Sequence, residues 1–267
     1  MCRPSYYTIA YEINPWMSLK RQTNHARATL QWIRLHTLLT RRLGVRVRLL
    51  PPRPRVPDLV FAANAGLVHR RTLILSNFRY PEREPEEPVI ERYFRRAGYR
   101  IVRLNSRYHF EGEGDALWVG DTLVFGFRFR SDAPAHEELA RVLGTRVLPV
   151  ELADRRFYHL DTCFCPLDAR TALWFPAAFD RYGRRVFEQL VPRLIPVSAQ
   201  DARRFACNAI PVGRSVVMQS GISPGLRRRM ARCGFTTHEV DLSEFLKAGG
   251  SAKCLVLWLR GGPQDAN

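Results

Sequence analysis

Cys254 is the residue whose type and surroundings most directly indicate covalent chemistry. It follows the glycine pair Gly249-Gly250 and comes directly after Lys253 in the segment GGSAKC. The thiolate is the reactive form of cysteine, and a neighbouring cation lowers the pKa of the thiol. We therefore expect Cys254 to be a nucleophile at the entrance of a strand, with Lys253 favouring its thiolate form.

The segment YHLDT predicts a proton-transfer partner for this thiol. His159 and Asp161 are two residues apart in it, so their side chains share one face of an extended chain. A histidine beside a cysteine is the usual general acid and base, and the aspartate could hold a cation against the pair. An H-x-D pattern is more often structural, so this interpretation depends on Cys254 lying nearby.

The segment FEGEGD brings three carboxylates, Glu111, Glu113 and Asp115, into one glycine-containing turn. Carboxylates this close repel one another unless a cation lies between them. The turn is therefore either a solvated acidic loop or one wall of a site for a cationic substrate.

Internal repetition indicates how these residues are positioned. Five segments, starting at residues 62, 113, 160, 207 and 253, share a small polar residue or cysteine followed by an apolar strand, usually with a second strand after a turn. Each of the first four is followed by a helical stretch (88–97, 133–143, 179–190 and 224–232) and then a short strand. Any α/β protein has units of about this length, but the regular spacing favours a true repeat. The marker residues recur at intervals of 46 to 51 and are Asn64, Asp115, Asp161, Asn208 and Cys254.

The N-terminal region supplies the missing part of the fifth unit. We expect strands over 5–13 and 45–50, a helix over 18–43 closed by Gly44, and pairing between the first strand and 253–259. Five such units around an axis share one core and hide most strand edges. The marker residues of all units should then converge on one central site. Residues 1–260 are expected to form this single α/β domain, and the polar tail 261–267 to be disordered.

The composition narrows the class of protein. No apolar stretch approaches 18 residues and no apolar leader is visible, so a cytoplasmic protein without a membrane span is expected. Its six cysteines should be reduced, and Cys163 and Cys165 are expected to be buried strand thiols rather than metal ligands. The net charge of +17 could serve an anionic partner. However, no aromatic-interleaved basic motif accompanies it, so neither nucleic acid nor a membrane is expected as partner.

Several segments together resemble the guanidine-group-modifying, or pentein, superfamily. They are NPW, DLVFAANAGLV, FEGEGD, FYHLDT and GGSAKCLVLWL. Within that superfamily the sequence is most similar to dimethylarginine dimethylaminohydrolases and arginine dihydrolases. The resemblance implies a five-bladed α/β propeller and a hydrolase of guanidinium C–N bonds that uses neither a metal nor another cofactor.

The resemblance also implies roles for individual residues. Cys254 matches the nucleophile and His159 the general acid and base. Asp161 matches the carboxylate that binds the guanidinium group, and Glu111 matches a second such carboxylate in the catalytic centre.

Four further positions match substrate-binding or supporting residues of the superfamily. Asp115 corresponds to a supporting carboxylate, and Arg130, in GFRFRS, to the arginine that binds the substrate α-carboxylate. Asn64 stands where arginine deiminases and dimethylargininases mostly carry aspartate. This departure, together with Asn14 in NPW, resembles the succinylarginine and arginine dihydrolases, which release ornithine.

We therefore expect a cysteine-dependent hydrolase that converts a small guanidino substrate to citrulline or ornithine through a covalent thiouronium. Two alternatives stay open at this point. An amidinotransferase would use the same residues with an amine in place of water. A non-catalytic basic propeller, like the ribosome anti-association factor of the same fold, would not need Cys254, His159 and Asp161 together. The sequence fixes neither the exact guanidino compound nor the oligomeric state.

Overall fold

The computed structural model describes residues 1–259 and shows four small sheets built to one plan. In each sheet the first two strands form an antiparallel hairpin, and the third strand pairs in parallel with the second. The sheets are β1 (Gly66–His69), β2 (Thr72–Leu75) and β3 (Arg100–Arg103); β4 (Ala116–Val119), β5 (Thr122–Phe127) and β6 (Val147–Glu151); β7 (Phe164–Pro166), β8 (Thr171–Trp174) and β9 (Arg193–Pro196); and β10 (Ile210–Val212), β11 (Ser215–Gln219) and β12 (Thr236–Val240).

One helix connects the second and third strands of each sheet, as a parallel crossover requires. The helices are α2 (Glu86–Arg96), α3 (Ala135–Leu143), α4 (Arg181–Leu190) and α6 (Pro224–Arg232), and a short α5 (Ala199–Arg203) follows β9. Gly98, Gly144 and Gly234 follow three of these helices with φ between +64° and +80°. Only glycine adopts that conformation readily, so the expected helix ends are confirmed at these positions.

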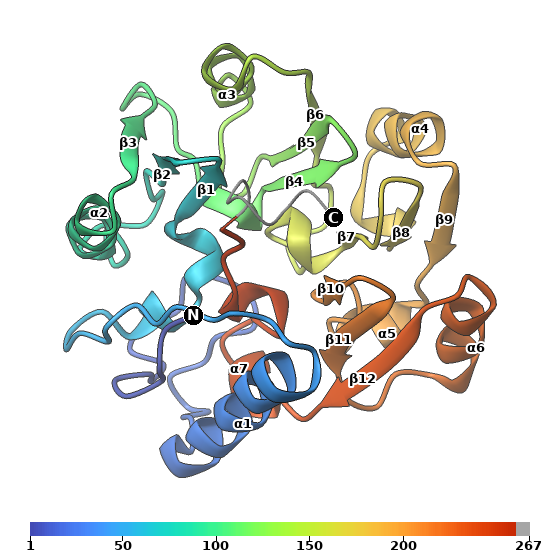
Figure 1. Ribbon diagram of the computed structural model, residues 1–267, viewed down its shortest axis with the longest axis horizontal. Helices are drawn as coiled ribbons and strands as arrows, with labels where there is room; N and C mark the ends of the chain where they lie inside the picture. The colour runs from blue at the N-terminus through green and yellow to red at the C-terminus, as the bar shows by residue number, and fades with distance from the viewer. Residues whose placement is uncertain (260–267) are drawn as a thin grey trace.

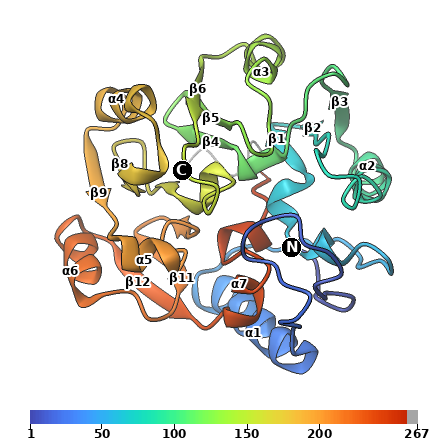
Figure 2. The same ribbon diagram turned by 180° about the vertical axis from the view of Figure 1, so that it is seen from behind.

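The four sheets lie around a common centre with their helices outermost (Figure 1). The remaining sector holds α1 (His25–Thr37), α7 (Ser243–Leu246) and the N-terminal segment, as the view from behind also shows (Figure 2). The expected α/β class and the four repeated units are thus confirmed. The predicted tail 261–267 lies outside the described residues. No helix in residues 1–259 is long and apolar enough to cross a membrane.

The expectation of three strands in the remaining sector was wrong. Within the described chain, the N-terminal segments contribute only a single bridge, between Cys2 and Leu50, and Lys253–Leu255 is a 3₁₀ turn. Side chains hold this sector instead of a ladder: the Tyr7 ring stacks on Phe245 at 5.1 Å. Such side-chain contacts can form whether or not the backbones pair, so the apolar pattern alone could not distinguish a paired strand from an unpaired segment.

The predicted helix over 18–43 begins later than expected. Asn24 caps α1 by accepting a hydrogen bond from the Arg27 backbone N–H, and its own N–H donates to Glu244. Residues before such an N-cap are not helical. Past Thr37 the chain continues as a π-helical turn, Leu38–Arg42.

The largest apolar cluster lies beneath α4 and between the third and fourth sheets. The Phe187 ring on α4 is fully buried, with ring centres 4.2 Å from Phe164 and 4.7 Å from Phe179. This packing fixes the third sheet, which begins directly after the turn that carries Asp161.

Phe187→Ala should lower the free energy of unfolding by about 3–5 kcal/mol, because it leaves a cavity among rings that cannot collapse. Chemical denaturation followed by fluorescence measures this. Tyr182→Ala, on the same helix but 58% exposed, should change it by less than about 0.5 kcal/mol. Equal losses in the two variants would show that α4 is not anchored through Phe187.

Candidate active site

Four 3₁₀ turns carry Asn64, Glu113, Asp161 and Cys254, and three further predicted residues, Glu111, Asp115 and His159, directly flank them. The turns are Ala62–Ala65, Gly112–Gly114, Leu160–Thr162 and Lys253–Leu255. The first three lie directly before the opening hairpin strand of their sheets. Such a turn places a polar side chain at the inner end of a strand rather than within the ladder. The turns therefore face the centre around which the sheets are arranged.

Buried hydrogen bonds join these turns to one another in chain order. The Asn64 amide donates to the backbone carbonyl of Glu111 at 3.3 Å, and Asp115 accepts from the Leu160 N–H at 3.1 Å. The Asn208 amide donates to the carbonyl of Asp161 at 3.2 Å. Asn64 and Asp115 thus bond to the following unit and Asn208 to the preceding one, so these neighbouring units meet at their marker residues.

Asn208 fixes the position of Cys254. Its Oδ1 accepts the backbone N–H groups of Ser251 (3.0 Å) and Cys254 (3.1 Å), and its Nδ2 lies 3.1 Å from the cysteine Sγ. The sulfur is also 3.4 Å from Asp161 Oδ2. Burial, followed by the charge of Asp161, raises the pKa of the Cys254 thiol well above its usual value. The resting residue is therefore a thiol held against a carboxyl group.

Lys253 acts on Cys254 in the expected direction, since its charge lowers the pKa of the thiol, but burial of the sulfur and the charge of Asp161 outweigh it. The lysine Nζ pairs with Glu113 Oε2 at 2.9 Å and donates to the carbonyl of Val256 at 3.1 Å.

His159 is joined to a buried network on the other side of Asn64. Its Nε2 lies 2.9 Å from Glu111 Oε2, and the same carboxylate oxygen accepts from Arg130 Nη1 at 3.1 Å. Burial lowers the pKa of His159 to about 4, although Glu111 opposes the shift. Burial would raise the pKa of Glu111, but Arg130 and His159 together hold it below its usual range. A neutral imidazole beside a carboxylate is ready to accept a proton.

The three carboxylates of FEGEGD do not share one cation. Glu111 faces Arg130, Glu113 faces Lys253, and Asp115 accepts from the Ser131 hydroxyl at 2.7 Å. Each side chain leaves the turn in its own direction and has its own partner. Repulsion among them is therefore relieved inside the protein, and Asp115 supports the wall of the site from behind.

A narrow cavity opens onto the Cys254 sulfur. Arg130 closes one side of it: the guanidinium lies between the Tyr80 and Tyr158 rings, 4.6 and 4.8 Å from their centres, and donates to the carbonyl of Ile13 at 2.9 Å. The lining residues are Ile13, Asn14, Met17, Asp58, Phe61, Asn64, Arg83, Arg130, Tyr158, Ala248 and Cys254. Asn14 stands at this wall because its amide donates to the carbonyl of Ala248.

The structure places two charged residues in the cavity that the sequence reasoning missed, Asp58 and Arg83. The buried Arg83 pairs with Glu86 at 2.7 Å and donates to Asn64 Oδ1 at 2.9 Å, which fixes the orientation of that amide. Asp58 Oδ1 is buried without a hydrogen bond of normal geometry in the described chain; burial raises its pKa, and the charge of Arg83 and the nearby Tyr11 hydroxyl oppose the shift. Asp58 opens the segment DLVFAANAGLV but was assigned no role from the sequence, and no repeat or motif marks Arg83; Asn208 was already marked by its place in the repeat.

The predicted site residues thus divide into two groups. Cys254, Asn64, Asn14 and Arg130 line the cavity. The others, His159, Glu111, Asp161 and Asp115, are buried immediately behind its wall. In the part of the chain that the structure describes, no hydrogen bond joins His159 to Cys254. Residues 1–259 also contain no group of three side chains that could hold a metal ion.

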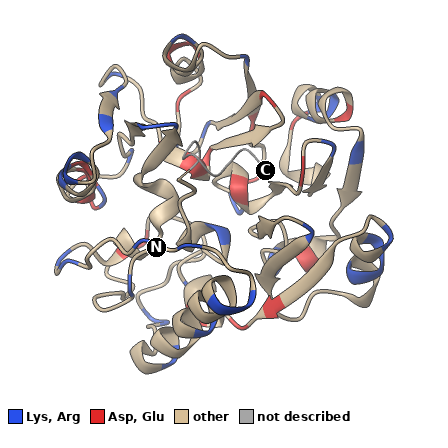
Figure 3. Ribbon diagram, viewed as in Figure 1, with Lys and Arg blue, Asp and Glu red and all other residues tan. Residues whose placement is uncertain are grey.

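The charges of the molecule are distributed to suit this centre. Lys and Arg lie over the outer helices and loops, whereas several Asp and Glu lie on ribbon near the middle (Figure 3). The buried carboxylates can therefore set the local field despite the net charge of +17, since solvent screens the outer arginines.

Comparison with known proteins identifies the class to which this fold and site belong. Residues 11–260 match the family model described as N,N dimethylarginine dimethylhydrolase, eukaryotic. The chain therefore belongs to the dimethylarginine dimethylaminohydrolase family.

Two relatives show where within the family the chain lies. It is 43% identical over 96% of its length to the bifunctional arginine dihydrolase/ornithine cyclodeaminase ArgZ of Synechocystis, of which it covers 37%. It is 39% identical over 96% of its length to the N(G),N(G)-dimethylarginine dimethylaminohydrolase of Mycobacterium tuberculosis, covering 84% of that protein. The chain thus spans well under half the length of ArgZ.

Solved structures agree with this placement. The N-terminal domain of ArgZ bound to its substrate superimposes with a TM-score of 0.93 at 42% identity, covering 97% of this chain and 96% of that one. A dimethylarginine dimethylaminohydrolase adduct with 4-chloro-2-hydroxymethylpyridine gives a TM-score of 0.77 at 26% identity, with 94% and 98% covered.

The buried Asp161 makes a pH-dependent prediction. Burial raises its pKa to about 7, so the folded chain retains a proton that the unfolded chain loses near pH 4. The native protein therefore loses stability as the pH rises from about 4 to 7. Relative to it, Asp161→Asn should gain about 1.4 kcal/mol of unfolding free energy per pH unit in that window.

Denaturation curves at several pH values measure this difference. The control is Asp121→Asn, at the exposed turn between β4 and β5, which should show no such trend. A flat difference for Asp161→Asn would mean that the carboxyl group is already ionised at low pH.

Proposed function

We propose that this chain hydrolyses the guanidinium C–N bonds of free arginine, with Cys254 as nucleophile. The observation that carries this proposal is the lining of one small cavity, in which the Cys254 thiol is accompanied by two arginines and the carboxylate of Asp58. Buried arginines suit a carboxylate because a guanidinium binds it with two parallel hydrogen bonds. An unpartnered buried carboxylate suits an ammonium group.

The cavity residues give the substrate a definite orientation. We place the α-carboxylate against Arg130 and Arg83, and the α-ammonium against the buried Asp58 carboxylate, whose Oδ1 is free to accept from it. The side chain extends toward Cys254, so that the guanidinium meets Asn64 and Asp161. Asp161 Oδ1 is likewise buried without a partner, which suits an N–H donor. Asn14 holds the loop wall beside this path.

The first chemical step follows from the protonation states. The incoming guanidinium brings a positive charge next to the Cys254 sulfur, where it lowers the raised pKa of the thiol. The thiolate attacks the central carbon, the C–N bond to the departing nitrogen breaks, and His159 passes the proton given up by the thiol to that nitrogen, which leaves as ammonia. This gives a covalent thiouronium. His159, with its low pKa, accepts a proton from the water that then displaces the sulfur, and a ureido product results.

Asn64 favours a second hydrolysis that continues to ornithine. A neutral amide holds a cationic guanidinium less tightly than aspartate would, but it both donates to and accepts from a neutral ureido group. The similarity to ArgZ, whose N-terminal domain is described as an arginine dihydrolase, supports the same end point. The products would be ornithine, carbon dioxide and two ammonia.

Dimethylarginine hydrolysis is the second candidate, supported by the 39% identity to the mycobacterial enzyme. It would stop at citrulline and release dimethylamine. The narrowness of the cavity at Cys254 favours the unsubstituted guanidinium.

We also infer that the sector with α1, α7 and the Cys254 turn is the fifth unit of a five-bladed propeller. It contributes Cys254 to the centre as the other units contribute their markers. Two observations support this inference: the isolated bridge between Cys2 and Leu50, and the place of the sector in the ring (Figure 1).

Incubation with arginine or dimethylarginine, with all products scored, tests the reaction. Arginine should give ornithine and ammonia in a ratio of one to two. Citrulline with a single ammonia would contradict the second hydrolysis, and faster release of dimethylamine from dimethylarginine would establish the second candidate. Including glycine as acceptor tests for amidino transfer.

Cys254→Ser should lower kcat by at least about a thousandfold. Acid quenching of the native protein during turnover, followed by intact mass spectrometry, should show an adduct that maps to Cys254. The matched control Cys233→Ser replaces a partly buried thiol elsewhere and should retain both turnover and adduct. Turnover by Cys254→Ser would refute the covalent mechanism.

Asp58→Asn should raise KM for arginine about tenfold or more, because it removes the charge opposite the α-ammonium. The KM for a guanidino acid without the α-amino group should stay unchanged. Steady-state kinetics with both substrates separate these outcomes, and equal effects on both would show that Asp58 acts only on the fold.

A further inference from the structure

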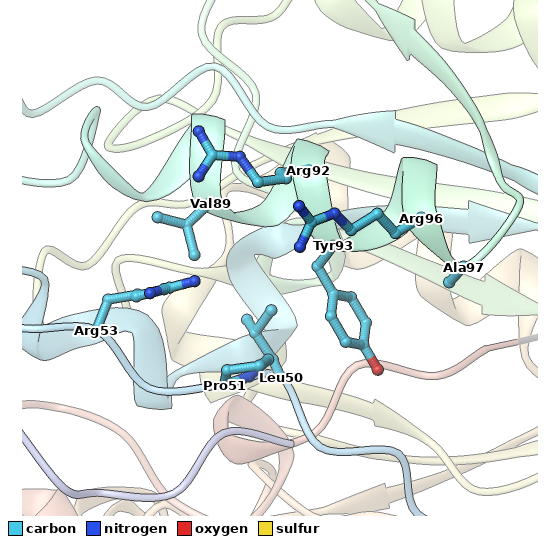
Figure 4. Close-up of a pocket in the computed structure, with 8 residues that line it drawn as sticks. All are labelled: Leu50, Pro51, Arg53, Val89, Arg92, Tyr93, Arg96 and Ala97. Atoms are coloured by element: carbon cyan, nitrogen blue, oxygen red, sulfur yellow. The ribbon is translucent and has the colours of Figure 1, made fainter.

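A second hollow lies on the outside of the molecule, remote from Cys254. It is formed by the loop after Leu50 and by one face of α2, and it encloses about 300 Å³, the lower end of the range for small-molecule sites, about 300–1,000 Å³. Figure 4 shows Arg92 and Arg96 extending from successive turns of the helix, and Arg53 projecting from the loop. The lining residues are Leu50, Pro51, Arg53, Val89, Arg92, Tyr93, Arg96 and Ala97.

The three arginines of this hollow lack partners. Within residues 1–259, the side chains of Arg53, Arg92 and Arg96 make no hydrogen bond, ion pair or ring contact. No residue that lines the hollow is acidic. Burial raises the pKa of Tyr93 and the charge of Arg48 opposes it, so a fourth cation lies close by. Uncompensated positive charge gathers here from separate segments of the chain.

Neighbouring arginines on and beside the same helix behave differently. Arg95 pairs with Glu91 at 2.7 Å, and Arg103 pairs with Glu87 at 3.0 Å and with Glu91 at 2.7 Å. Glu87 and Glu91 of α2 therefore pair with arginines that do not line the hollow. The negative C-terminal end of α2 explains why a cationic residue such as Arg96 is favourable there. It does not explain why Arg53 approaches from a different loop.

The floor of the hollow is apolar. Leu50, Val89 and Tyr93 belong to one hydrophobic cluster, and Ala97 closes the end of the hollow. A ligand that matches it would combine several negative charges with a flat or apolar body. Phosphate groups meet guanidinium forks with paired hydrogen bonds, and three arginines exceed what one carboxylate can use.

We propose that this hollow binds an organic phosphate with an apolar ring, such as a nucleotide. The phosphates meet Arg53, Arg92 and Arg96, and the ring lies on Val89 and Tyr93. The site shares no residue with the cavity at Cys254, so this proposal does not depend on the reaction assigned there.

Isothermal titration of the whole chain with ATP, inorganic pyrophosphate and adenosine tests the proposal. ATP should bind most tightly, pyrophosphate more weakly, and adenosine not measurably, and the affinity for ATP should fall with added salt. No binding of ATP would overturn the proposal. Equal affinity for ATP and pyrophosphate would overturn the role given to the apolar floor.

Two variants separate a built site from general basicity. The double variant Arg92→Glu with Arg96→Glu should weaken ATP binding about tenfold or more. Arg228→Glu with Arg232→Glu makes the same charge change four residues apart on α6, at exposed positions, and should leave the affinity within about twofold. Equal losses in the two double variants would identify a non-specific polyanion effect.

Val89→Trp fills the hollow without changing its charge. It should abolish ATP binding while pyrophosphate binding falls less, and an unchanged melting temperature would show that the fold is intact. Unaltered ATP binding in this variant would place the ligand elsewhere on the surface.

Discussion

Buried hydrogen bonds between successive units are the constraint on which the centre of this molecule depends. Asn64, Asp115 and Asn208 each bond to backbone of the next unit, and Asn208 also bonds to backbone of the preceding unit. A buried polar group without a partner is costly, so the units can meet in only one register. The same side chains that satisfy backbone groups therefore also place the sulfur, imidazole and carboxylates within one small region.

The two halves of the proposed acid–base system have separate partners. Cys254 is a thiol beside Asp161, and His159 is neutral beside Glu111. In the proposed reaction, a cationic guanidinium lowers the raised pKa of the Cys254 thiol and keeps His159 neutral. Under that proposal, the reactivity of Cys254 is tied to the charge of its substrate.

The repeat made much of this predictable from sequence. The four sheets, their helices and the glycine stops follow from local patterns, and α6 occupies the predicted residues. Convergence of the markers followed from their spacing. The ion pairs could not be predicted from the spacing, since Lys253 pairs with Glu113 rather than with the sulfur. Arg83 and Asp58 reach the cavity through tertiary packing. Likewise the strands expected in the N-terminal sector have the right apolar pattern, but side-chain stacking such as that of Tyr7 on Phe245 replaces a ladder.

The last described turn of the chain carries Cys254, while the residues that hold it come from much earlier. Asn208 binds its backbone, and Tyr158 donates from its hydroxyl to the carbonyl of Gly249 at 2.8 Å. On the ribosome, the other four sectors emerge before this turn does. A nascent or broken chain that lacks it would contain His159 and the carboxylates but not the proposed nucleophile. Under the proposed mechanism, activity would therefore arise only when synthesis has passed residue 254.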